Sequence, residues 1–259
     1  MSATGLSQLP PAVLEEGQRR YTAVRERIAA AAIRAQRDPD DIILVGVAKK
    51  QPVERTLAAI GAGLRVLGQS YIQEARTIRP EIEAALAADS ATADLRLEWR
   101  MVGRLQRNKA ALAARLFDAI ESVDRLELVE TLERRAKTEG RVLEVMVQVS
   151  LCGEPQKGGC EPEALPALCS QIFACESLRL GGFMTVPAAN PDPEAARPIF
   201  RRLRALRDEL AERFPGLESA ALSMGMSQDF EVAIEEGATL VRVGTALFGE
   251  RIVAPSAIR

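Results

Sequence analysis

Short runs of apolar residues recur along the chain, and most are followed by a longer segment in which apolar residues return every third or fourth position. Apolar runs of about four to eight residues are typical of buried β-strands, and the longer spacing is typical of helices. The pattern predicts eight strands, at residues 42–48, 64–67, 98–102, 118–123, 143–149, 178–184, 220–224 and 239–243.

The segments between these strands are rich in Ala, Leu, Glu and Arg, which are strong helix formers. They predict helices at 52–62, 72–87, 126–138, 162–174 and 193–213. Another helix is expected at 11–36, within an N-terminal helical segment 1–40. Because no strand precedes it, we expect this helix to pack outside the sheet or to close one end of it.

Strict alternation of strands and helices indicates parallel strands joined by right-handed crossovers. Eight repeats favour a single α/β barrel of the (β/α)8 TIM type with an additional N-terminal helix, and an open doubly wound sheet is the alternative. A chain of 259 residues suits one such barrel. No boundary between two domains is evident, so we expect one domain over 1–259 that ends in a loose tail at 253–259.

Charge and hydropathy exclude two classes of partner. The formal net charge of -2 provides no excess of cations for a nucleic-acid backbone. The apolar stretch 28–33 lies between Arg27 and Arg34, so it is too short for a membrane span of about 20 residues. No secretory signal is recognisable at the start of the chain. We therefore expect neither nucleic acid nor a membrane as a partner.

The absence of histidine restricts the possible chemistry. It excludes a Ser-His-Asp triad, a Cys-His pair and any metal site with histidine ligands. Four cysteines, Cys152, Cys160, Cys169 and Cys175, lack the Cys-x-x-Cys spacing of zinc and redox sites. We interpret them as reduced thiols of a cytoplasmic protein and expect no metal site.

Lys49 and Lys50 end the first predicted strand. Alternation along a strand sends their side chains to opposite faces, so one of them can point into the barrel mouth. Burial there favours the neutral amine, which can condense with an aldehyde to form a Schiff base. A solvated lysine pair is the simpler explanation of these two residues alone.

The seventh and eighth strands are followed by residues suited to a phosphate, which TIM barrels commonly bind at this place. Ser227 follows a turn rich in Gly and Met and is predicted to be the N-cap of a helical run at 230–236. Gly244 and Thr245 follow the eighth strand and offer backbone N–H groups and a hydroxyl. Ordinary capping could explain either turn, but the two together favour a phosphate cradle.

Arg242 ends the eighth strand, where it could pair with Glu235 or Glu236 or lie against a ligand. An amine for an aldehyde beside a phosphate cradle matches pyridoxal 5'-phosphate (PLP). A guanidinium against its pyridine nitrogen would discourage protonation and weaken the ring as an electron sink. Met226 precedes Ser227 and is a candidate contact of the cofactor, although barrel packing explains it more simply.

At about 42–251 the chain resembles the pyridoxal-phosphate homeostasis proteins. The most specific segments are Leu222-Ser223-Met224-Gly225-Met226-Ser227-x-Asp229 and Val241-Arg242-x-Gly244-Thr245. Supporting segments are Val47-x-Lys49-x-x-Pro52, Gly68-x-x-Tyr71-x-Gln73-Glu74 and Gly103-x-Leu105-Gln106-x-Asn108-Lys109.

This resemblance implies a barrel related to the N-terminal domain of bacterial alanine racemase, in which the first lysine of the pair, Lys49, forms the Schiff base with PLP. It implies that Ser227, Gly244 and Thr245 surround the phosphate and that Arg242 lies near the pyridine nitrogen. It also implies a protein that buffers PLP or delivers it to apo-enzymes, without robust catalysis of its own.

Five residues depart from those usual in the family, and they bear on the polarity of the mouth and on any amino-acid ligand. They are Ala48, Ser70, Arg100, Arg104 and Gly181.

Two other functions remain open at this point. One is a PLP-dependent racemase, lyase or aldolase, with Tyr71 or a carboxylate as a second base. Racemisation needs a base on each face of the substrate, and the chain has only two tyrosines, Tyr21 and Tyr71. The other is a barrel that binds a different phosphorylated ligand, with Lys49 as a point charge. We expect a monomer, because a carrier needs no second subunit to complete its mouth.

Overall fold

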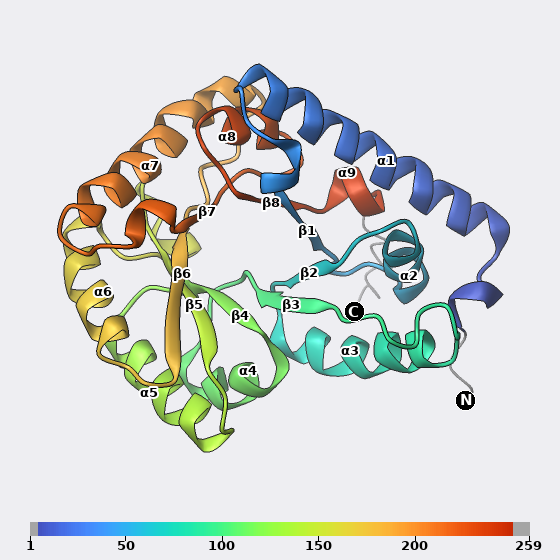
Figure 1. Cartoon of the computed structure of the whole chain (residues 1–259), viewed down its shortest axis with the longest axis horizontal. Helices are drawn as coiled ribbons and strands as arrows, with labels where there is room; N and C mark the ends of the chain where they lie inside the picture. Colours follow the sequence, from blue (N-terminus) through green and yellow to red (C-terminus); the bar gives the residue numbers. More distant parts are fainter. Residues whose placement is uncertain (1–4, 251–259) are drawn as a thin grey trace, which may run out of the picture.

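The computed structural model describes residues 5–250, so the predicted tail at 253–259 lies outside the described residues. Its strands are β1 Ile43–Val47, β2 Val66–Gln69, β3 Glu98–Met101, β4 Ala119–Val123, β5 Leu143–Gln148, β6 Leu178–Met184, β7 Ala221–Ser223 and β8 Leu240–Val243. They run parallel in one closed barrel (Figure 1). The predicted barrel is confirmed. The open-sheet alternative is wrong, because β8 is hydrogen-bonded to β1.

Helices cover the outside of the barrel (Figure 1). They are α1 Pro11–Arg34, α2 Val53–Gly61, α3 Ile72–Ala87, α4 Ala110–Leu116, α5 Leu126–Thr138, α6 Leu165–Phe173, α7 Arg197–Ala211, α8 Phe230–Glu235 and α9 Thr245–Phe248. The predicted helices agree with these bounds to within a few residues, apart from the first turns of two segments, which are 3-10 helices before α6 and α7. Helices α4 and α9 were not predicted.

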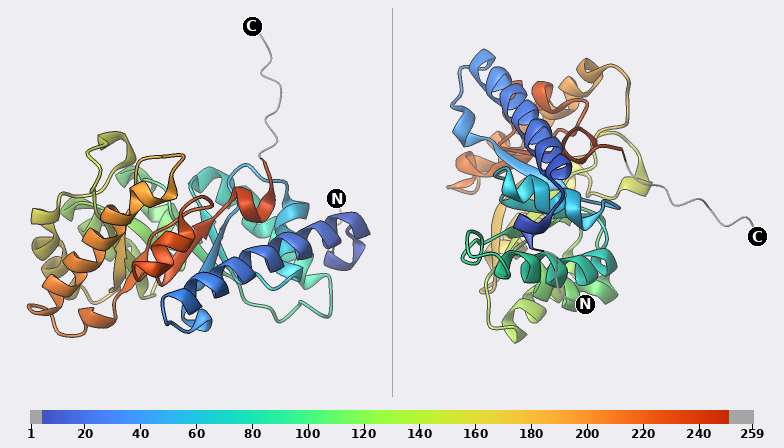
Figure 2. Two further views of the ribbon diagram at one scale, coloured as in Figure 1. Left: turned by 90° about the horizontal axis from the view of Figure 1, so that it is seen from above. Right: turned by 90° about the vertical axis from the view of Figure 1, so that its right-hand side faces the viewer.

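The long N-terminal helix α1 packs outside the barrel, against α2, α8 and α9 (Figures 1 and 2). Val24, Ile28 and Ala31 form a buried stripe at helical spacing on the face toward these helices. Near the start of α1 the approach is very close, since a Cβ atom at Gly17 would lie 2.6 Å from the Cβ of Ala58. Of the two expected positions for this helix, the outer one is therefore confirmed.

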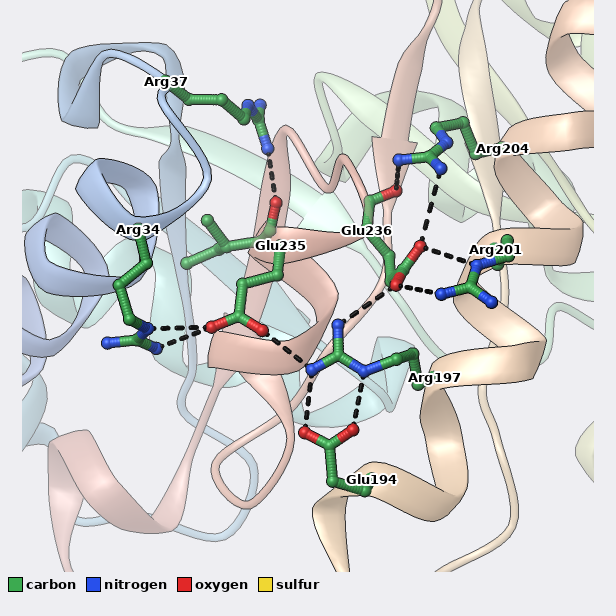
Figure 3. Close-up of polar contacts among 9 residues, drawn as sticks. Arg34, Arg37, Glu194, Arg197, Arg201, Arg204, Glu235 and Glu236 are labelled. Carbon is green, nitrogen blue, oxygen red and sulfur yellow. Dashed lines mark hydrogen bonds and ion pairs between the residues drawn. The ribbon is translucent and has the colours of Figure 1, made fainter.

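A network of ion pairs fastens α1 to α7 and α8 (Figure 3). Arg197 of α7 donates to Glu235 at 2.8 Å and to Glu236 at 3.0 Å. Arg34 of α1 lies 2.8 Å from the other carboxylate oxygen of Glu235, and Arg201 lies 2.9 Å from Glu236. The network holds α8, and with it the β7–β8 corner of the barrel, against its neighbours.

Polar side chains occupy the middle of the barrel, where TIM barrels usually pack branched aliphatic residues. Arg100 of β3, Glu121 of β4, Ser223 of β7 and Arg242 of β8 are all buried. The hydroxyl of Ser223 donates to Glu121 at 2.5 Å, although β4 and β7 are not neighbouring strands. This hydrogen bond therefore crosses the interior of the barrel.

Candidate functional site

A cavity of about 700 Å³ opens at the carboxyl ends of the strands. It is lined by all six residues that the sequence singled out, namely Lys49, Met226, Ser227, Arg242, Gly244 and Thr245. These residues come from the ends of β1, β7 and β8, which adjoin in the closed barrel. Parallel strands present their carboxyl ends at one rim, which is why residues about 200 positions apart meet here.

Lys49 faces the cavity, and Lys50 does not line it. The Lys49 Nζ lies 4.6 Å from the centroid of the Tyr71 ring, over its face. Lys50 is exposed, and its φ of 55° is rare for a residue with a side chain. Its backbone N–H donates to Glu74 at 2.5 Å, which helps to hold this turn. Only one of the two lysines faces the cavity, as expected, but strand alternation is not the reason, because β1 ends at Val47 and both lysines lie in the turn that follows it.

Ser227 is not the N-cap that the sequence predicted. Helix α8 begins at Phe230, and its N-cap position is Asp229, whose carboxylate accepts from the N–H of Met226 at 2.6 Å. The Ser227 hydroxyl oxygen instead accepts from the N–H groups of Gly244 and Ala246, each at 3.3 Å. The hydroxyl thus joins the β7 turn to the β8 turn and marks a point where two backbone donors converge.

Two glycines let the backbone turns around this point pack closely. Gly225 has a φ of 90°, and a Cβ atom there would lie 2.6 Å from the Cβ of Ala233. At Gly244 an added Cβ would lie 3.2 Å from the carbonyl oxygen of Val47 in β1. A side chain at either position would push the β7 or β8 turn outward.

Arg242 lines the cavity and is almost completely buried. It donates to the hydroxyl of Ser223 and to the carbonyl oxygen of Thr185, both at 2.7 Å. Burial lowers the pKa of Arg242, and the carboxylates of Glu121 and Asp229 oppose that effect. An arginine starts from so high a pKa that it stays a cation here.

The expected alternative partners of Arg242 were Glu235 and Glu236, and that expectation is wrong. Both glutamates belong to the network of Figure 3, where they pair with arginines of α1 and α7. Both glutamates are close to β8 in sequence, but they lie at the end of α8, on the outside of the barrel.

Glu121 and Ser223 were missed as members of the site, although they hold Arg242 from below. Glu121 also accepts from Arg100 at 2.6 Å, and Arg100 reaches Glu144 at 2.8 Å. A lone carboxylate in the apolar run of β4 was the signal in the sequence that could have revealed this chain of contacts. A charge in a buried strand needs a partner.

The five departures from the family pattern do not all lie in the mouth. Ser70 lines the cavity of Lys49, but Ala48 is fully buried. Arg100 lies inside the barrel with its carboxylate partners, so the expectation that it alters the mouth is wrong. Gly181 makes room for Glu144, whose Cδ would lie 2.7 Å from an added Cβ. Arg104 lies on the other side of Lys49, where a second cavity opens.

Within residues 5–250 no group of three or more Cys, Asp or Glu side chains is arranged to hold a metal ion. Over the same range, no helix is long and apolar enough to cross a membrane. All four cysteines are free thiols, as predicted.

Known proteins with this architecture are numerous. The family described as "Alanine racemase, N-terminal domain" matches residues 22–252. A pyridoxal phosphate homeostasis protein of Aquifex aeolicus is 41% identical over 232 residues, which cover 90% of this chain and 97% of that protein. The protein of the same name in Escherichia coli K12 is 36% identical, covering 88% of this chain and 94% of that protein.

Solved structures agree with these sequence matches. An unknown protein from Bifidobacterium adolescentis has a TM-score of 0.85 at 33% identity, covering 95% of this chain and 99% of that one. PipY of Synechococcus elongatus, with PLP bound, has a TM-score of 0.73 at 34% identity, covering 87% of this chain and 100% of that one. An alanine racemase of Clostridium difficile, at 18% identity, shares the fold. This chain therefore belongs to the family described as "Alanine racemase, N-terminal domain" and, within it, to the pyridoxal phosphate homeostasis proteins.

Proposed function

We propose that this protein binds PLP in the cavity of Lys49 and serves PLP homeostasis by holding and releasing the cofactor. The observation that carries the proposal is the convergence of Lys49 with the Ser227–Gly244 corner in one cavity. Close relatives bear that function in their names, and one solved relative holds PLP.

The residues present fit this cofactor. Lys49 provides a primary amine at one side of the cavity. At the other side, the N–H groups of Gly244 and Ala246 and the hydroxyls of Ser227 and Thr245 are donors suited to a phosphate dianion. When bound, PLP supplies an aldehyde for the amine and a pyridine ring that can delocalise charge.

Arg242 would determine what the bound ring can do. Its guanidinium has no acceptor and keeps its protons, which are donated to Ser223 and Thr185. As a fixed cation lining the cavity, it would disfavour protonation of the pyridine nitrogen of the bound cofactor by charge repulsion. The site therefore suits holding the cofactor better than stabilising a carbanion, which supports a carrier rather than an enzyme.

A matched pair of variants tests this proposal. We expect the purified protein with added PLP to absorb at wavelengths typical of a protein-bound pyridoxyl imine, and borohydride to fix a pyridoxyl group on the peptide that contains Lys49. Lys49→Ala should lose both signals. Lys50→Ala changes an adjacent lysine that faces solvent and should keep them. A pyridoxyl label on Lys50, or none at all, would contradict the proposal.

A PLP enzyme is the second candidate, favoured by the position of the Tyr71 ring at 4.6 Å from Lys49 Nζ. A tyrosine beside the lysine could serve as the second base of a racemase or as a proton donor in a lyase or aldolase. Incubation of the loaded protein with single amino acids in deuterated water decides between the two. Deuterium entering the α-position at an enzyme-like rate would favour this candidate over the carrier.

We propose further that the protein works as a cytoplasmic monomer that passes PLP to apo-enzymes. The four free thiols support a reducing compartment. Sedimentation equilibrium tests the monomer. Mixing the loaded protein with an apo-aminotransferase in the presence of a scavenger of free PLP tests the transfer, since activity regained despite the scavenger requires direct delivery.

A further inference from the structure

A second cavity, of about 840 Å³, adjoins the first one at the barrel mouth. The two share Lys49, Ser70, Val102 and Val186. The first cavity extends from these residues toward the ends of β7 and β8, and the second extends toward the loops after β2, β3 and β5. Lys49 therefore stands at the boundary, and the second cavity lies on the side away from the phosphate corner.

The lining of the second cavity is strongly cationic. Its charged members are Lys49, Arg104, Arg107, Lys109, Arg125 and Lys157, and its described lining includes no Asp or Glu. Glutamine side chains supply further hydrogen-bonding groups on the same walls, and they are Gln73, Gln106, Gln148 and Gln156.

Among the described residues, only two of these six cations have a carboxylate partner. Arg125 pairs with Asp124 and Lys157 with Glu154. Arg104, Arg107 and Lys109 form no ion pair with any residue between 5 and 250. All three come from the single loop after β3, so their charges accumulate on one wall. Such like charges repel one another unless an anion lies among them.

Arg104 also leans across the cavity. Its side-chain Cδ would lie 3.4 Å from a Cβ atom built on Gly158, in the loop after β5. The aliphatic part of Arg104 therefore reaches the loop after β5, where the carboxylate of Asp124, the partner of Arg125, lies equally close to the same point. The cavity is a concave site of ordinary size for a small molecule, for which about 300–1,000 Å³ is typical.

We propose that the second cavity binds a small polyanion, namely a dicarboxylate or a phosphorylated metabolite, through Arg104, Arg107 and Lys109. Lys49 lines both cavities, so an anion bound in the second cavity would lie near the Lys49 amine. This site goes beyond the proposed function, because it uses none of the residues of the phosphate corner.

Calorimetric titration of the purified protein at low salt tests the site with two probes, succinate and inorganic pyrophosphate, and with acetate as a monovalent reference. The variant Arg107→Gln/Lys109→Gln should bind at least one probe about tenfold more weakly or worse, since each charged hydrogen bond contributes about 1.5–3 kcal/mol. Arg104→Gln, which changes one exposed side chain, should weaken the same probe. Whichever probe responds identifies the ligand as a dicarboxylate or a phosphate compound, and a response of both indicates a general polyanion site.

The matched control is Arg134→Gln/Arg135→Gln, which removes the same charge from the exposed face of α5, toward the opposite end of the barrel. It should change the affinity by less than about twofold. Equal weakening by both double variants, or no binding of either probe by the unmodified protein, would overturn the proposal. Binding abolished by Ser227→Ala but not by Arg107→Gln/Lys109→Gln would place the anion in the phosphate corner and would also overturn it, while leaving the proposed PLP site intact.

Discussion

Charged residues at the centre of a barrel are tolerated only when each has a partner, and Glu121 provides one for two cations. Its carboxylate accepts from Arg100 and from the hydroxyl of Ser223, which in turn accepts from Arg242. Taking such charges out of water costs several kcal/mol per ion, and the attraction within the chain of contacts offsets that cost. The cation under the first cavity is therefore held in place by a carboxylate that lines neither cavity.

Replacing Glu121 should consequently destabilise the whole fold. Glu121→Gln keeps the size of the side chain but leaves Arg100 and Arg242 without their shared negative charge, so we expect a loss of about 3–5 kcal/mol in the free energy of unfolding. Urea unfolding followed by circular dichroism measures it. Glu130→Gln, on the exposed face of α5, should stay within about 0.5 kcal/mol of the unmodified protein. A similar small change for Glu121→Gln would show that the buried carboxylate contributes little.

At the scale of elements, the arginine network decides how the outer helices hold the β7–β8 corner. Glu235 lies between Arg34 of α1 and Arg197 of α7, so three helices meet at one carboxylate (Figure 3). The hydrogen bond from Arg197 is the main reason why the pKa of Glu235 lies below its ordinary value, with Arg34 adding to the effect.

This lowered pKa gives the network a pH dependence. A carboxylate with a lowered pKa in the folded state adds stability above its ordinary pKa, about 4.3, and that stability is lost as the pH falls through this value and below it. Arg197→Met should therefore lower the free energy of unfolding by about 1–2 kcal/mol at pH 7. The difference from the unmodified protein should shrink toward pH 3.

Unfolding in urea between pH 3 and pH 7 measures this dependence. Arg202→Met, on the same helix, removes an exposed arginine whose only ion-pair partner within residues 5–250 is the exposed Glu209, and it should change the stability by less than about 1 kcal/mol at every pH. If the deficit of Arg197→Met were the same at pH 3 as at pH 7, lost packing rather than lost charge would explain it.

Most helices and strands could be predicted from the sequence, but the side-chain contacts between them could not. Apolar runs predicted all eight strands and their order, because buried parallel strands carry a strong local pattern. Helix α4 escaped prediction, since it is short and follows a loop of cations and amides without a clear start signal. The expected cap by Ser227 failed because its hydroxyl bonds to residues 17 and 19 positions away, which local spacing does not reveal.

For the candidate site, the sequence placed the residues at the correct rim but not their connections. Lys49, Ser227 and Gly244 were expected together, because barrel topology brings the ends of the first, seventh and eighth strands side by side. The contact of Glu121 with Ser223 spans the barrel and depends on which side chains face inward at the same height. Only the closed sheet defines that geometry.

On the scale of the whole molecule, binding of PLP should stabilise the folded chain against unfolding. A ligand that binds only the folded chain raises the free energy of unfolding by about 2.7 kcal/mol when its concentration is 100 times its dissociation constant. For a chain of 259 residues this corresponds to a rise of about 5–10 °C in the midpoint of thermal unfolding. Differential scanning fluorimetry with increasing PLP measures the rise. Lys50→Ala should show it in full, and a full rise in Lys49→Ala would contradict a covalent attachment at that lysine.

The hydrogen bonds from the Gly244 and Ala246 amides to the Ser227 hydroxyl also bear on how easily the protein would release PLP from the proposed site. A buried amide N–H without a hydrogen-bond acceptor costs free energy, so a site whose donors bind only the ligand releases that ligand slowly. In the proposed site the Ser227 hydroxyl oxygen would replace the departing phosphate oxygen, because it already accepts from these two amides. Binding and release of PLP at the proposed site would then exchange one hydrogen-bond acceptor for another at little cost in free energy, which suits the proposed role as a reservoir.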